Sequence, residues 1–174
     1  AVLGMVMGLA GGVGAIALQR RRAQFQLTKV TVRVLGQELE FVVNAHYRKA
    51  AWEIFVETMT RVATQPLDAD SGRLREALAS LYSLFNSTRE LLKRIEPTPT
   101  IEGRTVESLA IEMLNKHIRP YLSYWHPRVA GDSQDEFYEP QCRMQLDELR
   151  KRLMEFEKAF GKLAGVQQLD DFFD

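Results

Sequence analysis

An uncharged apolar run of eighteen residues, AVLGMVMGLAGGVGAIAL, opens the sequence and is followed by Gln19 and three arginines at positions 20–22. As an α-helix with a rise of about 1.5 Å per residue, this run would reach roughly 27 Å. The hydrocarbon layer of a bilayer is about 30 Å thick, and arginine side chains at one end can extend to the lipid headgroups. The run therefore predicts a transmembrane helix over residues 1–19.

Two other interpretations of the apolar run stay open. Ala15 and Ala17 resemble the cleavage site of a signal peptide, but a signal peptide also needs a positive segment before the run, and this sequence shows none. A buried or interfacial helix is the second alternative. If the run spans a membrane, the arginines on its C-terminal side predict that the following residues lie in the cytosol.

Small residues form a stripe within this run. Gly4, Gly8 and Gly12 recur at every fourth position and so share one face of a helix. Such a face lets two helix backbones approach closely in lipid, where packing drives association. The stripe predicts self-association, although glycine is also common in membrane helices that only anchor.

The rest of the chain has the length and composition of one domain. Without the apolar run about 150 residues remain, which is a usual size for a single hydrophobic core. The formal net charge is zero, but residues 20–29 are basic and residues 166–174 are acidic. Cys142 is the only cysteine, so the sequence excludes a disulfide framework and favours a reducing compartment.

A β-hairpin is expected directly after the basic connector. Residues 30–34 and 38–43 are rich in β-formers and flank Leu35, Gly36 and Gln37. A two-stranded hairpin is only marginally stable alone, so it should pack on the helices or pair with the hairpin of another subunit.

Four segments with helical periodicity follow the hairpin. They cover residues 45–64, 71–95, 105–126 and 140–164. Asn44 and Thr105 suit helix N-caps, Pro140 suits a first turn, and Gly165 suits a C-terminal cap.

Each helix is expected to bury one apolar face. In the first helix this face comprises Trp52, Phe55, Val56, Met59, Val62 and Ala63. The second carries a heptad seam of Leu74, Leu78, Leu81, Phe85, Thr88, Leu92 and Ile95. The third buries Val106, Leu109, Ala110, Met113, Leu114, Ile118, Leu122 and Trp125. The fourth buries Cys142, Leu146, Leu149, Leu153, Phe156, Phe160 and Leu163.

Two prolines constrain the third helix. Pro120 predicts a kink between His117 and Leu122, and Pro127 is expected to close the helix at His126. The predicted fold is mostly α: a single N-terminal transmembrane helix, a short β-hairpin and then a four-helix bundle. Its parts are the membrane helix at 1–19, a basic juxtamembrane connector at 20–29, a cytosolic hairpin and bundle at 30–165, and an acidic tail at 166–174.

Sequence signatures of catalysis are absent. The three histidines form no metal-binding pair, and the sequence has no HExxH motif, no glycine-rich phosphate loop outside the apolar run and no Gly-x-Ser-x-Gly motif. We therefore expect no catalytic residues, no cofactor and no metal. A non-enzymatic protein is favoured, with a hydrolase built from scattered carboxylates as the alternative.

Residues 115–128 hold the densest group of polar and aromatic side chains. A candidate ligand surface comprises Arg119, Tyr121, Trp125, His126 and Arg128. Aromatic rings and guanidinium groups can stack on and bind anionic or nucleotide ligands. In the alternative interpretation, Tyr121 and Trp125 are core side chains whose polar ends are hydrogen-bonded.

Three runs carry a resemblance, at residues 46–52, 75–85 and 114–127. Over about residues 30–165, the chain resembles an uncharacterised family of bacterial helical-domain proteins, marked by an Arg-Pro-Tyr-Leu-x-x-Trp-His-Pro segment. The resemblance implies a bacterial and non-enzymatic protein, and it carries over no activity or catalytic residue.

The expected function follows from the predicted membrane anchor and from the lack of catalytic motifs in the predicted bundle. We expect a single-pass protein of the bacterial inner membrane whose cytosolic bundle acts as an oligomerising sensor, scaffold or effector component in a stress or phage-defence system. Its expected partners are membrane lipid, further copies of the chain and a larger protein complex. The alternative is a membrane-tethered nucleotide or nucleic-acid binding module.

Overall fold

The computed structural model describes residues 27–65, 73–95, 103–130 and 139–173. The predicted transmembrane helix lies outside these residues, as do the stripe of Gly4, Gly8 and Gly12 and most of the basic connector. Of the helices in the described ranges, none has the length and apolar character needed to cross a bilayer.

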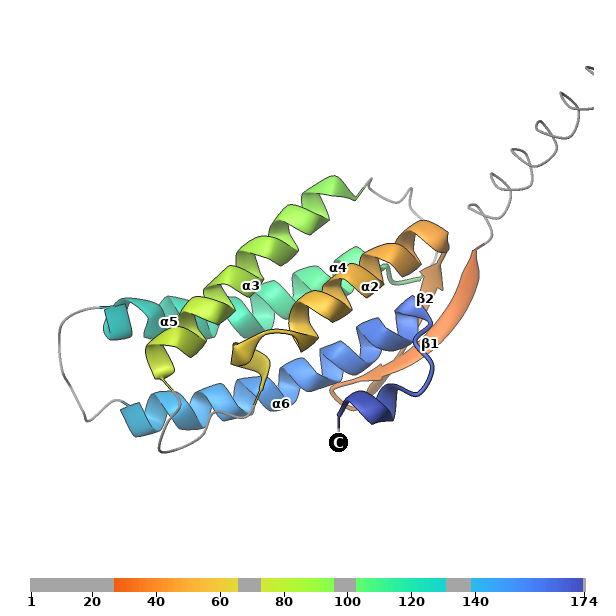
Figure 1. Cartoon of the computed structure of the whole chain (residues 1–174). Coiled ribbons are helices and arrows are strands. Elements are labelled where there is room, and N and C mark those ends of the chain that lie inside the picture. The colour runs from red at the N-terminus through yellow and green to blue at the C-terminus, as the bar shows by residue number, and fades with distance from the viewer. Residues whose placement is uncertain (1–26, 66–72, 96–102, 131–138, 174) are drawn as a thin grey trace, which may run out of the picture.

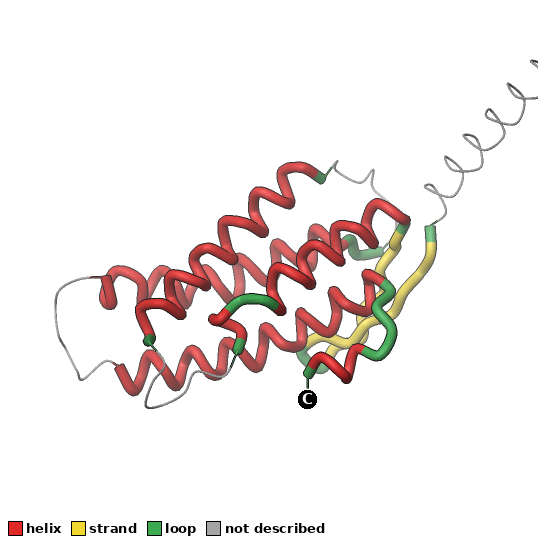
Figure 2. Tube along the Cα trace, viewed as in Figure 1, coloured by secondary structure: helices red, strands yellow, loops and turns green. Residues whose placement is uncertain are grey.

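The described chain is mostly helical, with a short antiparallel hairpin and four helical units, as predicted. Figure 1 shows the helices lying side by side, and Figure 2 shows both strands at one end of them, beside the C-terminal end of α6. The elements are β1 (Thr28–Val34), β2 (Gln37–Val43), α2 (Ala45–Met59), η1 (Val62–Thr64), α3 (Leu74–Arg94), α4 (Val106–Glu112), η2 (Met113–Ile118), α5 (Arg119–Ala130), α6 (Glu139–Ala164) and η3 (Leu169–Phe172).

The hairpin packs on the helices. Its turn is the pair Leu35 and Gly36, both with positive φ (50° and 79°), and Gln37 already belongs to β2. Positive φ at both central residues is the geometry of a tight hairpin turn. Val32 and Val34 are buried on the face that meets α6.

The two edges of the hairpin differ. On the β2 edge, Val42 N donates to Arg104 O and Arg104 N donates to Glu40 O, both at 3.2 Å. On β1, the residues Lys29 and Arg33 are exposed, and charged side chains of this kind hinder pairing with another strand.

The predicted inner face of the first helix is partly wrong. Trp52 and Val56 are 47% and 37% exposed, and α2 ends at Met59 rather than at residue 64. The helix buries Tyr47, Ala50, Ala51, Ile54, Phe55 and Thr58. Alanines let α2 approach α6 closely, and hydropathy alone does not separate an alanine face from a solvent face. The predicted cap is confirmed, because Asn44 Oδ1 accepts a 2.8 Å hydrogen bond from Tyr47 N.

The seam of α3 is confirmed at its centre. Leu74, Leu78, Leu81 and Thr88 are buried, together with Ala77, Leu84 and Leu91. Phe85 and Leu92 lie at the flank of the seam and are partly buried.

The third predicted helix is a continuous helical run, α4–η2–α5. Thr105 and Ser108 form a reciprocal capping box at its start. All eight predicted core residues of this run are buried. The irregular stretch is a π-helical segment at Met113–Ile118, and Pro120 follows it closely. Proline has no backbone N–H to donate within a helix, and the wider π turn tolerates this missing hydrogen bond. The predicted end at His126 is wrong, because α5 continues to Ala130 with Pro127 inside it.

The long helix α6 agrees with its predicted pattern, since all seven predicted core residues are buried. Gly165 follows it with φ +83°, as a C-terminal cap requires. The chain then turns back, and η3 packs on the helices. A Cβ atom on Gly161 would lie 2.2 Å from Leu169 Cδ2 and 3.1 Å from Phe55 Cε2, so glycine makes this close approach possible.

Candidate functional site

An open groove lies between α3 and α5. It has a volume of about 340 Å³ and is lined by Tyr82, Phe85, Arg119, Leu122, Ser123, His126 and Pro127. On α5, positions 119, 122, 123 and 126 are three or four residues apart, so they face the same side of the helix. On α3, the exposed Tyr82 lies beside the heptad seam, and Phe85, at the flank of the seam, packs partly on the core and also lines the groove.

Each end of the groove pairs an aromatic ring of α3 with a nitrogen-bearing side chain of α5. Arg119 Cζ lies 5.4 Å from the centroid of the Phe85 ring. The rings of Tyr82 and His126 have centroids 5.2 Å apart with an interplanar angle of 34°. Arginine over a ring face is attracted by the ring quadrupole. These contacts hold Arg119 and His126 across the groove from Phe85 and Tyr82.

The charge of the groove is positive. No acidic side chain of the described residues lines it. Among the described residues, Arg119 forms no ion pair, whereas Arg61, Arg104 and Arg143 each have a carboxylate partner. The guanidinium edge of Arg119 is therefore available to an anion from solution.

Four of the five predicted ligand-surface residues divide between two faces of α5. Arg119 and His126 line the groove. Tyr121 and Trp125 are buried on the opposite side, as the alternative interpretation predicted. Tyr121 Oη donates to Cys142 O at 3.1 Å, and Trp125 Nε1 donates to Gln145 Oε1 at 2.8 Å.

The fifth residue, Arg128, belongs to neither face. Its Cζ lies 3.8 Å from the centroid of the Tyr124 ring, and its Nη1 donates to Tyr124 O. Both residues are exposed and lie outside the groove lining. The sequence pattern missed Tyr82, and it placed Phe85 in the apolar seam of α3 without assigning it to the site. Their signal was a pair of aromatic residues three positions apart at the edge of the α3 seam.

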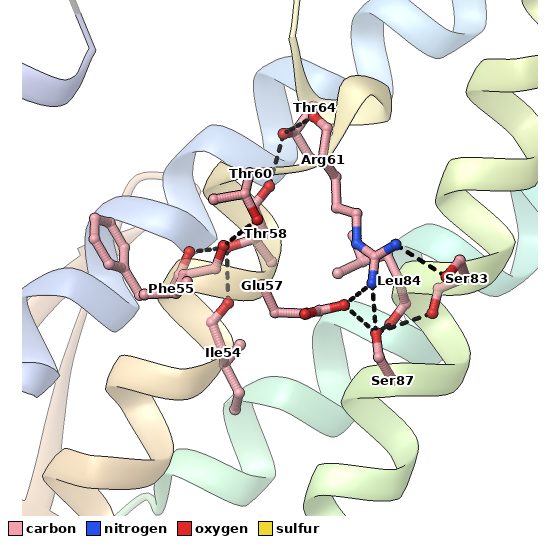
Figure 3. A network of polar contacts seen from close by, with 11 residues as sticks. Ile54, Phe55, Glu57, Thr58, Thr60, Arg61, Thr64, Ser83, Leu84 and Ser87 are labelled. Atoms are coloured by element: carbon pink, nitrogen blue, oxygen red, sulfur yellow. Dashed lines mark hydrogen bonds and ion pairs between the residues drawn. The ribbon is translucent and has the colours of Figure 1, made fainter.

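A second polar cluster joins α2 to α3, as Figure 3 shows. Arg61 forms an ion pair with Glu57 and donates to Ser83 Oγ at 2.9 Å and to Ser87 Oγ at 3.3 Å. Ser87 Oγ also contacts Glu57 Oε1. The charges of this cluster neutralise one another, so the cluster serves to fasten α2 to α3 and offers a ligand no unpaired charge.

Glu157 is an acidic residue buried in α6, with 4% of its surface exposed. Burial raises the pKa of its carboxyl to about 7, and a hydrogen bond from Thr64 and the charge of Arg150 oppose this rise. Its Oε1 has no hydrogen-bond partner among the described residues. Because it is outside the groove lining, its titration acts on the stability of the core.

The remaining reactive groups are poorly suited to chemistry. Burial raises the pKa of the Cys142 thiol, so it stays protonated at neutral pH rather than forming a nucleophilic thiolate. Burial and the nearby Arg152 lower the pKa of His117, whose ring lies 5.1 Å from that of Phe156.

Metal ligation has no support in the described residues, because no three His, Cys, Asp or Glu side chains there come together as ligands. The described geometry offers a groove suited to binding. No family model, curated protein or solved structure matches the chain.

Proposed function

We propose that this chain is a non-enzymatic, membrane-anchored sensor whose helical bundle binds a small ligand in the groove between α3 and α5. The observation that carries the proposal is the groove itself, which is open, lined by both helices and, within the described part of the chain, free of acidic side chains. Its volume of about 340 Å³ falls in the range of roughly 300–1,000 Å³ that is usual for small-molecule sites.

The groove is placed where a ligand would affect the whole bundle. A molecule held between α3 and α5 would contact both helices at once. The α3 helix is fastened to α2 through Arg61, and α5 is fastened to α6 through Tyr121 and Trp125. A ligand that binds one arrangement of α3 and α5 more tightly than another shifts the population of the bundle towards that arrangement.

The anchor and the assembly belong to the same proposal and are supported by the sequence. Residues 1–19 have the length and apolarity of a membrane helix, and Gly4, Gly8 and Gly12 offer a surface for self-association. In this proposal the ligand-dependent bundle controls how the membrane helices associate, with the bundle on the cytosolic side of a bacterial inner membrane.

Cross-linking of the full chain in membranes tests the assembly. We expect oligomers for the parent and for the control Val6→Leu, which lies off the stripe, but monomers for Gly8→Leu. Bulky side chains on a small-residue face keep the helix backbones apart. A monomeric parent would refute the assembly part of the proposal.

The second candidate is a tethered nucleotide or nucleic-acid binder. It is favoured by Arg119 and His126, which lie beside aromatic rings in the groove. Titration of the full chain with a single-stranded oligonucleotide at two salt concentrations tests it. Contacts to several phosphates make affinity fall steeply with salt. Absence of binding at low salt would refute nucleic-acid binding.

A further inference from the structure

We propose that the ligand of the α3/α5 groove is a small flat aromatic molecule that carries one anionic group, a carboxylate or a phosphate. The anion would bind Arg119, and the ring would lie along the aromatic and apolar wall. This inference rests on the proposed function, because it names the chemistry of the ligand that the groove would sense.

The anionic group of the ligand is inferred from the exposure and the contacts of Arg119. Its Cζ lies over the Phe85 ring, 5.4 Å from the ring centroid, and its side chain is exposed. Among the described residues no ion pair engages its guanidinium, so its N–H donors can bond a ligand. A planar carboxylate or a phosphate accepts two such parallel hydrogen bonds.

The nearest acidic residue along this helical run is already engaged. Glu112 pairs with Arg104 at 3.0 Å and with Lys116 at 2.9 Å. These two cations lower the pKa of its carboxyl, so it stays charged and bound to them. Among the described residues Arg119 thus has no carboxylate partner, and its guanidinium can pair with an external anion.

The aromatic ring of the ligand is inferred from the aromatic and apolar side chains that line the groove. Tyr82 is 50% exposed, and it lies beside the exposed ring of His126. Phe85 is partly buried, and the buried Leu122 and the exposed Pro127 add apolar surface. Two aromatic rings in offset or edge contact attract each other, and this attraction adds to the stabilisation from burying their surface. A flat ring would thus find aromatic partners on α3 and an apolar surface on α5.

The size of the ligand is limited by the spacing of the two ends. Arg119 and His126 are seven residues apart on α5, which is two helical turns or about 10 Å. His126 and Ser123 can hydrogen-bond a polar substituent of the ring. The volume of about 340 Å³ suits one small molecule rather than a nucleic-acid strand.

Three probes that share a naphthalene ring but differ in charge test whether the ligand must be anionic. They are 2-naphthoate, 2-naphthylmethanol and 2-naphthylmethylammonium, titrated calorimetrically into the full chain in lipid nanodiscs with empty nanodiscs as the blank. We expect 2-naphthoate to bind at least ten-fold more tightly than the neutral probe, and the cationic probe not to bind.

Matched variants test whether the ligand binds in the α3/α5 groove. Arg119→Gln and Tyr82→Ala should each weaken 2-naphthoate at least ten-fold. Arg128→Gln and Tyr124→Ala should leave binding unchanged, since these residues are exposed on the same helix but lie outside the groove. Circular dichroism and thermal melting of each variant show that the fold is retained.

The outcomes separate the two proposals. If the neutral probe binds as tightly as 2-naphthoate, and Tyr82→Ala weakens both, the anionic ligand is refuted while ligand binding in the groove stands. If none of the three probes binds, the aromatic anionic ligand is refuted. If an oligonucleotide binds with a steep salt dependence while 2-naphthoate does not, the small ligand is refuted in favour of a nucleic acid.

Discussion

The two long helix pairs of the bundle meet in different ways. Where α2 packs on α6, small residues such as Ala50, Ala51 and Gly161 bring the helices together, and the returning tail adds Leu169 and Phe172 against them. Between α3 and α5 the contact residues are large, and a groove of about 340 Å³ stays open. The size of the residues at a helix contact therefore decides whether the pair closes or leaves a binding surface.

The largest expected effect contrasts one aromatic residue from each pair. Phe55 is buried between α2, α6 and the tail, so Phe55→Ala should lower the free energy of unfolding by about 4 kcal/mol. Tyr82 is half exposed in the groove, so Tyr82→Ala should change it by less than about 1 kcal/mol. Urea denaturation measures both. Equal losses would show that the groove side is as closed as the α2/α6 side.

The closed pair also contains a buried acid, and its pH dependence is the next effect in size. With a pKa of about 7 in the folded state against 4.5 in the unfolded state, Glu157 binds a proton in the folded protein that the unfolded chain has released. Rising pH therefore favours unfolding between about 4.5 and 7, and stability levels off above 7. The shift corresponds to roughly 3 kcal/mol.

Glu157→Gln tests this pH dependence. The glutamine cannot ionise, so denaturation curves of the variant should lose most of the fall between pH 4.5 and 7, and the variant should be the more stable protein at pH 8. As a control, Glu148→Gln changes an acid that is exposed on the same helix. An unchanged pH profile in Glu157→Gln would assign the titration to another group.

A smaller effect is expected at the contact between α6 and the tail. Gly161→Ala should gain about 1 kcal/mol in helix propensity, but its Cβ would meet Leu169 Cδ2 at 2.2 Å and Phe55 Cε2 at 3.1 Å. We expect a net loss of about 1 kcal/mol, since overpacking usually costs more than propensity gains. In the Leu169→Ala background the loss should shrink. Thermal melting of the double-mutant cycle measures this, and an unchanged loss would contradict the contact.

The smallest expected effect concerns the open groove between α3 and α5. Ser123 lies exposed in the groove, so Ser123→Leu fills apolar space and should stabilise the bundle by about 0.5 kcal/mol. It should also abolish binding of 2-naphthoate. Ser123→Ala raises helix propensity without filling the groove and should keep that binding. Calorimetry and thermal melting distinguish the two variants, and retained binding in Ser123→Leu would place the ligand elsewhere.

Sequence periodicity predicted the elements best where large apolar residues mark the buried face. Leu149, Leu153 and Phe156 in α6 are buried as expected. In α2 the same reasoning was right for Phe55 and wrong for Trp52, which lies on the surface, because the alanines that face α6 carry little hydropathy signal. The expectation that Pro127 ends the helix also failed, because Pro127 lies inside α5.

The candidate site was predictable only in part. Its α5 residues could be found as an unusual polar and aromatic segment, but the helical period separates Arg119 and His126 from Tyr121 and Trp125. Only the packing of α3 against α5 decided which face meets Tyr82 and Phe85, since these residues are more than thirty positions away from Arg119 along the chain.

The sequence by itself determined the hairpin, the helical units, their caps and most of the core, because turn chemistry, capping and apolar periodicity act between near neighbours. The tertiary structure decided that α2 closes on α6, that Arg119 lacks a carboxylate partner among the described residues, and that a groove stays open beside it. These features depend on which helices meet and on the size of the side chains between them, and residues distant in the chain set both.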